Sequence, residues 1–194
     1  MFELTAAALA EPDLPQPTRE RLEKIVEQAQ WLADLIQDSL HTAGSDAAGD
    51  CQADLFRVVS EAVAAERLTW PGDVAMLGEA RPVFTAVHPV LLRRMVANLL
   101  SNATRAAGPS GLVTIEISYN WCSAQLAIED TGPGFGKIEH GLGLGLAEVS
   151  RCVAAYGGTL DYGCGAAGGT RVSLRLPRTI DPAMAALTPS IHSA

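Results

Sequence analysis

The chain has 194 residues, a formal net charge of −8, and 48% hydrophobic residues. This length suits one domain of ordinary size with an appendage, and the acidic balance argues against nucleic acid as the main partner, because phosphate backbones recruit basic surfaces. No hydrophobic stretch approaches membrane-spanning length, and no signal peptide is visible. The four cysteines lack paired metal spacing, which is compatible with a reducing compartment. We therefore expect a cytoplasmic protein with no membrane segment in this chain.

The amino-terminal part predicts a long amphipathic helix over residues 17–41. Apolar residues recur there close to a heptad spacing, and charged residues lie outside this apolar stripe. The stripe consists of Leu22, Ile25, Val26, Ala29, Leu32, Ala33, Ile36 and Leu40. Such stripes seldom stay exposed on a soluble monomer, and two-fold dimers are the commonest way to cover them. We expect a homodimer, or a tight complex with a partner helix, through this segment; the alternative is a helix that packs on its own domain.

A small, polar linker (residues 42–50) follows and is the best candidate for a domain boundary. Beyond it, the patterns predict both helices and strands, in a domain over residues 51–180. The predicted helices cover residues 53–67, 88–108 and 144–156, and the predicted strands cover residues 74–77, 82–87, 112–119, 124–129, 159–162 and 170–176. Residues 181–194 indicate a flexible tail.

The predicted helix over residues 88–108 carries two amides on an otherwise apolar pattern. Asn98 and Asn102 are four residues apart, so they project from one side of the helix. Polar groups without partners are costly to bury, so the pair needs an explanation. The amides either cap a neighbouring loop or face a magnesium ion, which takes oxygen ligands and shares them with phosphates.

Two glycine-rich segments follow in quick succession. The first, DTGPGFG, opens at Asp130, and the second, GLGLGL, begins at Gly141 and enters the third predicted helix. Glycine lets the backbone approach a ligand closely, and a helix N-terminus directs free N–H groups toward phosphate. Together with the amide pair, these segments predict a nucleotide pocket.

The motifs resemble those of the catalytic, ATP-binding domain of sensor histidine kinases. They are similar to the N, G1 and G2 boxes and the closing strand of that family, which here are NLLSNA from Asn98, DTGPG from Asp130, GLGLGL from Gly141 and GGT from Gly168. The resemblance covers about residues 50 to 180 and implies an α+β fold of the Bergerat (GHKL) type. In that fold a mixed sheet is covered by helices on one face; here a helical, hairpin-like segment over residues 1–41 would precede it, as part of the family's dimerisation hairpin.

The resemblance also implies a function. The chain would be the ATP-binding catalytic part of a protein histidine kinase, a transferase of two-component signal transduction. It would use ATP and Mg²⁺ and pass the γ-phosphoryl group to a histidine on a hairpin helix. The expected partners are that H-box helix, from the full-length protein or a separate chain, and a response regulator of the phosphorelay.

Individual roles carry over from the family. Asp130 would accept a hydrogen bond from the exocyclic amine of adenine and exclude guanine, which carries a carbonyl there; Thr170 would support this contact. Asn102 would coordinate Mg²⁺, and Asn98 would be a second polar group beside the phosphates. The other residues implied in ATP binding are Arg105, Gly132, Gly134, Lys137, Gly141, Gly143, Gly145 and Leu146.

Position 98 bears on the branch of the superfamily. Members that hydrolyse ATP or phosphorylate serine usually carry a glutamate there as general base. Asn98 cannot accept a proton in that way. The resemblance therefore favours transfer to an acceptor that is already nucleophilic, such as imidazole, over a serine kinase that acts on an anti-sigma antagonist.

The sequence departs from the family at two places. None of its four histidines lies in an H box, so we expect either a fragment or a split kinase whose acceptor belongs to a partner chain. Only four residues separate Gly136 from Gly141, where the family has a longer mobile lid; extended, they span about 13 Å. The short lid leaves an alternative open: a degenerate member that acts as a binding or scaffold protein with weak or no ATP use.

Overall fold

The computed structural model describes residues 52–134, 144–166 and 168–181, together with Pro15, Thr18 and Ile25. The chain divides into two compact units, residues 1–47 and 48–194. In the first unit Thr18 and Ile25 are helical, and the Thr18 N–H donates to the Pro15 carbonyl at 2.9 Å. The rest of the predicted dimerisation helix, the linker and the tail beyond residue 181 lie outside the described residues. The domain boundaries and the homodimer therefore stay predictions.

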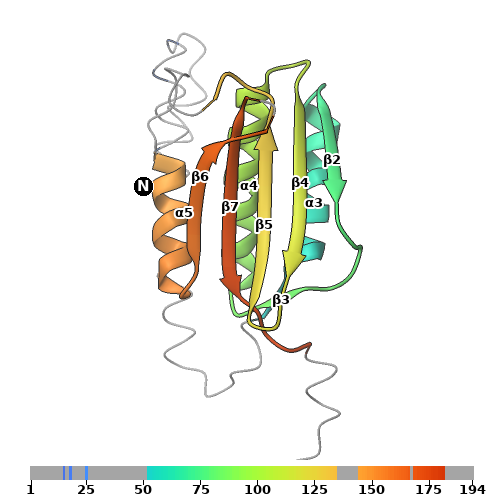
Figure 1. Cartoon of the computed structure of the whole chain (residues 1–194). Coiled ribbons are helices and arrows are strands. Elements are labelled where there is room, and N and C mark those ends of the chain that lie inside the picture. Colours follow the sequence, from blue (N-terminus) through green and yellow to red (C-terminus); the bar gives the residue numbers. More distant parts are fainter. Residues whose placement is uncertain are drawn as a thin grey trace, which may run out of the picture. The chain divides into compact units, whose positions relative to one another are not determined.

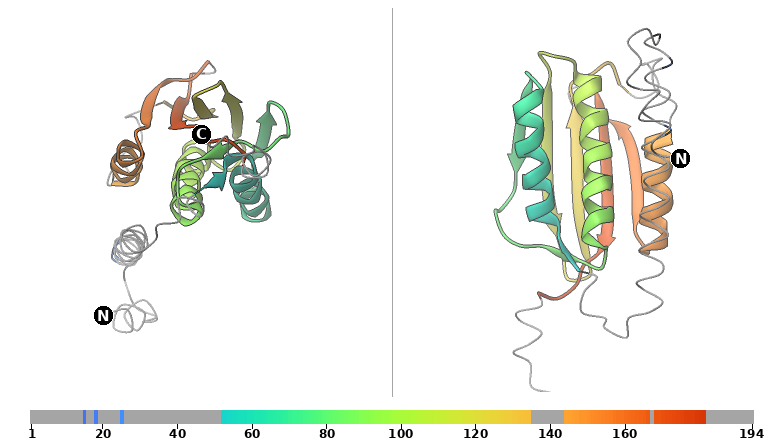
Figure 2. Two further views of the ribbon diagram at one scale, coloured as in Figure 1. Left: turned by 90° about the horizontal axis from the view of Figure 1, so that it is seen from below. Right: turned by 180° about the vertical axis from the view of Figure 1, so that it is seen from behind.

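The described part of the second unit is a five-stranded mixed sheet with helices on one face (Figures 1 and 2). In spatial order the strands are β2 (Asp73–Leu77), β4 (Leu112–Tyr119), β5 (Ser123–Asp130), β7 (Thr170–Pro177) and β6 (Thr159–Cys164). β2 runs parallel to β4, and the other neighbours are antiparallel. The helices are α3 (Leu55–Thr69), α4 (Pro89–Ala107) and α5 (Leu144–Ala155). This arrangement confirms the predicted α+β sandwich.

Two short strands form a separate sheet; the sequence predicted a strand over residues 82–87 but not the strand that pairs with it. β1 (Ala53–Asp54) pairs antiparallel with β3 (Phe84–Thr85). The predicted strand over residues 82–87 is therefore shorter than expected, and the helix predicted from residue 53 begins at Leu55. The reason lies in Asp54, whose Oδ1 accepts a hydrogen bond from the Phe56 N–H at 3.0 Å and so caps the helix after the strand has ended.

Local chemistry sets the ends of α4. Pro89 occupies its first turn, where a missing N–H costs nothing, and the Nδ1 of His88 accepts from the Val90 N–H at 3.4 Å. Gly108 ends the helix with a φ of 73°, a conformation that glycine adopts without strain. His88 is thus the N-cap, and the helix begins one residue later than the predicted residue 88.

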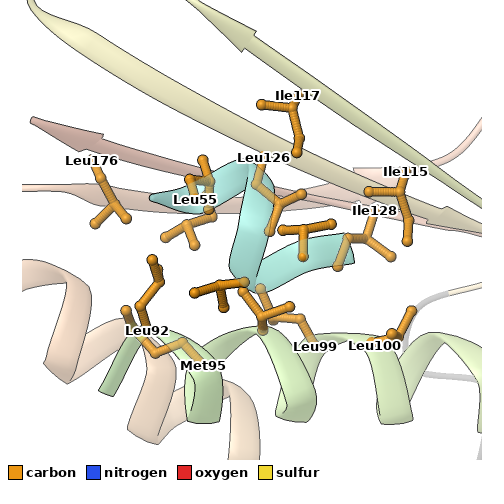
Figure 3. Packing of buried hydrophobic residues seen from close by; sticks show 14 of the residues in the cluster. Leu55, Leu92, Met95, Leu99, Leu100, Ile115, Ile117, Leu126, Ile128 and Leu176 are labelled. Atoms are coloured by element: carbon orange, nitrogen blue, oxygen red, sulfur yellow. The ribbon is translucent and has the colours of Figure 1, made fainter. Parts of the chain in front are cut away.

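The core lies between α4 and the sheet (Figure 3). Inward-facing residues of β4 and β5, such as Ile115 and Leu126, meet the apolar side of α4, which includes Leu92 and Leu99. All four are at most 2% exposed, and burial of each such side chain contributes about 1.5–3 kcal/mol. This packing fixes α4 against β5, so that their carboxyl-terminal ends meet at one end of the domain. None of the described helices is long and apolar enough to cross a membrane.

Candidate functional site

The carboxylate of Asp130 is the centre of the candidate site. Asp130 is the last residue of β5 and is only 4% exposed, because strand alternation places it on the helix-covered face with Ile128. Its Oδ1 accepts hydrogen bonds from the N–H groups of Gly132, at 2.8 Å, and Thr170, at 3.2 Å. These donors offset the cost of burying the charge and fix the orientation of the carboxylate. Among the described residues nothing donates to Oδ2.

Glycines pack directly around this carboxylate. A Cβ atom on Gly132 would lie 2.5 Å from the Ala106 carbonyl oxygen, so only glycine lets this segment contact the last turn of α4. Gly134 has a φ of 97° and passes beside the Gly168 carbonyl. Gly169 lies so close to the main chain of Asp130 that a Cβ there would overlap the Asp130 carbonyl oxygen. Gly132, Gly134 and Gly169 thus let three stretches of backbone converge on one acidic side chain.

Gly169→Ala should open this cluster. The added methyl group would have to displace the main chain of Asp130, and overpacking of this kind costs about 1–3 kcal/mol of unfolding free energy. The matched control is Gly163→Ala on β6, where an added Cβ has nothing within 4 Å. Denaturant titration should show a lower midpoint for the first variant and an unchanged or slightly higher one for the second. Equal midpoints would mean that the close packing of Gly169 on Asp130 is wrong.

The polar side chains of α4 lie along the helix from the Asp130 cluster. Asn98 and Asn102 are both half-buried, and neither amide has a hydrogen-bond partner within the part of the chain that the structure describes. Asn102 is one turn before Ala106, whose carbonyl contacts Gly132, and therefore about 6 Å along the helix from the carboxylate cluster. Arg105 is exposed, and its Nη2 donates to the Ser101 hydroxyl at 3.3 Å.

The second glycine-rich segment is described only from Leu144 onward. Gly145 lies in the first turn of α5, and Leu146 is half-buried against the core. The second turn holds Glu148, a carboxylate only 9% exposed that the sequence analysis did not single out. Lys137, Gly141, Gly143 and the short lid lie outside the described residues. Their roles in ATP binding stay predictions.

The structure thus brings together Asp130, Gly132, Gly134 and Thr170, with Asn102 one helical turn away. It is the main-chain N–H of Thr170 that reaches Asp130; the role of Thr170 in supporting the adenine contact stays a prediction. Gly169 is the residue of this cluster to which the sequence assigned no role. A buried carboxylate between two glycine-rich turns, on a mixed sheet under helices, is the Bergerat arrangement.

Comparison with known proteins agrees with this fold. Residues 87–180 match the family described as histidine kinase-, DNA gyrase B-, and HSP90-like ATPase. The chain is 28% identical to the sensor-like histidine kinase SenX3 of Mycolicibacterium smegmatis, over 94% of this chain and 54% of that protein. It is 27% identical to the probable sensor histidine kinase TcrY of Mycobacterium tuberculosis, over 85% of this chain and 39% of that protein.

A solved structure is similar in the same region. The ATP-binding domain of PrrB from Mycobacterium tuberculosis is 28% identical, with a TM-score of 0.57 over 66% of this chain and 97% of that structure. The domain of this chain is therefore similar in fold and sequence to ATP-binding domains of the histidine kinase (GHKL) type. The chain spans only about half the length, or less, of the curated relatives named above.

Proposed function

We propose that this chain is the ATP-binding catalytic part of a two-component sensor histidine kinase, which transfers the γ-phosphoryl group of ATP to a histidine on an H-box hairpin helix. The observation that carries the proposal is the geometry of Asp130. Its buried carboxylate is anchored through one oxygen by two main-chain N–H groups, and its other oxygen accepts no hydrogen bond from the described residues.

The geometry of Asp130 indicates which nucleobase the site would bind. The Oδ2 of Asp130 would accept a hydrogen bond from the exocyclic amine of adenine, and such a charge-assisted bond is worth about 1.5–3 kcal/mol. Guanine presents a carbonyl oxygen at the same position, so oxygen would face oxygen. We infer that the pocket selects adenine over guanine.

The phosphate end would lie along α4 toward the start of α5. The amide oxygen of Asn102 suits Mg²⁺, which prefers oxygen ligands and keeps phosphate oxygens and waters as its other ligands; Mg²⁺ bound there would neutralise charge on the phosphates. Among the described residues no three His, Cys, Asp or Glu side chains gather to hold a metal by themselves, so this ion would depend on the nucleotide. Asn98, Arg105 and Lys137 would complete the phosphate contacts.

The amide side chain of Asn98 favours phosphoryl transfer to a histidine over hydrolysis of ATP. An amide does not take a proton from water at neutral pH, so the site lacks the general base that hydrolysis needs there. An imidazole acceptor brings its own nucleophilic nitrogen, and the chain then needs only to orient the γ-phosphoryl group toward it. This function requires a homodimer through residues 17–41. It also requires two partners, an H-box helix and a response regulator.

Labelled ATP tests the proposal. The chain alone should remain unlabelled, because none of its histidines lies in an H box, whereas a separately supplied hairpin carrying an H box should acquire a phosphohistidine. The same hairpin with its H-box histidine replaced by glutamine is the control. A stable phosphohistidine at His41 or His88 would contradict the proposal. An unlabelled hairpin beside a chain that binds ADP would favour the scaffold alternative.

A further inference from the structure

The sheet face opposite the helices carries a cluster of charged side chains. Glu129 of β5 is the register partner of Arg171 of β7. Glu116 of β4 pairs with Ala127, two residues before Glu129. Side chains alternate along a strand, and Asp130 faces the helices. Glu129, Arg171 and Glu116 therefore project together from the other face.

Arg171 bridges the two carboxylates of this cluster. Its Nη2 lies 2.8 Å from Glu116 Oε2, and its Nη1 lies 3.1 Å from Glu129 Oε2. The hydrogen bonds to Glu116 and then to Glu129 raise the pKa of Arg171 above its usual value, so it stays charged. The side chain of Glu129 is only 16% exposed, against 45% for Glu116. Of the two ion pairs, the one with Glu129 is thus the less screened by solvent.

The second oxygen of Glu129 holds the turn between β6 and β7. Glu129 Oε1 accepts a hydrogen bond from the Ala166 N–H at 2.6 Å. Gly165 packs on the same side chain, since a Cβ there would lie 2.8 Å from that oxygen. One carboxylate thus binds Arg171 through one oxygen and the turn through the other.

The same turn also contacts the candidate base pocket, which is the proposed adenine site at Asp130. The Gly165 N–H donates to the Gly169 carbonyl at 2.8 Å, and Gly169 packs on the main chain of Asp130. The next residue, Thr170, donates its N–H to the Asp130 carboxylate. A continuous set of contacts therefore runs from Arg171 through Glu129 and the turn to Asp130.

We propose that Arg171 is a positioning residue for the base pocket: it orients Glu129, which holds the β6–β7 turn against Asp130. This inference rests on the proposed function, because it takes adenine as the ligand of Asp130. Arg171 itself lies on the opposite sheet face and does not touch the ligand. Partly exposed ion pairs contribute little to global stability, so its loss should affect the pocket more than the unfolding of the domain.

The test compares Arg171→Met with Arg175→Met. Arg175 is an exposed residue on the same face of the same strand, four residues further from Asp130, so it controls for loss of a surface charge. Calorimetry with ADP should show roughly fivefold weaker binding for Arg171→Met and less than a twofold change for Arg175→Met. In an Asp130→Asn background the effect of Arg171→Met should vanish, because the two changes act on one contact.

Amide hydrogen exchange without nucleotide separates this inference from the proposed function. The N–H groups of Ala166 and Thr170 should exchange roughly fivefold or more faster in Arg171→Met than in wild type, and unchanged in Arg175→Met. If wild type fails to bind ADP, the proposed function is wrong, and the exchange rates still decide whether Arg171 holds the turn. Equal exchange in the two variants would overturn the positioning role, as would equal ADP affinities when wild type binds.

Discussion

Asp130→Asn should weaken ADP binding by roughly a hundredfold while the domain stays folded. The amide oxygen of the new side chain can still accept from the N–H groups of Gly132 and Thr170, so the pocket keeps its internal hydrogen bonds. The new NH₂ group, however, takes the place of Oδ2 and meets the amine of adenine donor to donor. A charge-assisted bond worth about 1.5–3 kcal/mol is lost, which is about ten- to hundredfold in Kd before the repulsion is added.

Calorimetry with ADP, ATP and GTP measures this effect. Asp161→Asn is the matched control, because Asp161 lies exposed on β6 and its change removes the same charge. We expect wild-type affinity in the control and no measurable GTP binding in wild type. If Asp130→Asn binds ADP like wild type, or wild type binds GTP as tightly as ATP, the adenine role of Asp130 is wrong.

The sequence predicted the elements that are long enough to contain several repeats of an apolar spacing. β4 covers the predicted residues 112–119, and α4 lies within the predicted residues 88–108, because each offers several repeats of an apolar spacing. β1 and β3 have two residues each, too few for a period. Their pairing depends on contacts across some 30 residues of chain, which no local pattern contains.

The candidate site shows the same division. Asp130, Asn98 and Asn102 stood out because a carboxylate before a glycine run and two amides on an apolar helix are unusual in their local context. Glu129 and Arg171 did not stand out. They are 42 residues apart, and each alone is an ordinary charge on a half-exposed strand.

Two further residues were missed for related reasons. Gly169 must be glycine because it packs on the Asp130 main chain, which the strand register brings beside it. Glu148 sits in an apolar stretch between Leu146 and Val149, where the helical pattern is complete without it. For Gly169 the missing information was the tertiary neighbour, and sequence spacing does not contain it.

Asn102→Ala should separate the phosphate end of the pocket from the base end. Adenosine would contact Asp130 but carries no phosphate, so its affinity should stay within about twofold of wild type. ATP should lose the gain in affinity that Mg²⁺ gives to wild type, because the amide oxygen that would share the ion is gone. Phosphotransfer to an H-box hairpin should then fall by roughly a hundredfold, as is usual when one group that stabilises a charged transition state is removed.

Displacement of a fluorescent adenine nucleotide by adenosine, ADP and ATP, with and without Mg²⁺, measures these affinities. Asn102→Asp supplies the control, since a carboxylate keeps an oxygen at the same position and should retain part of the Mg²⁺ dependence. A parallel loss of adenosine and ATP affinity in Asn102→Ala would show that the residue supports the fold of the pocket rather than the ion. Asn102 lies one helical turn from the carboxylate cluster. If Asn102→Ala keeps the gain in ATP affinity that Mg²⁺ gives, the ion is held by other residues.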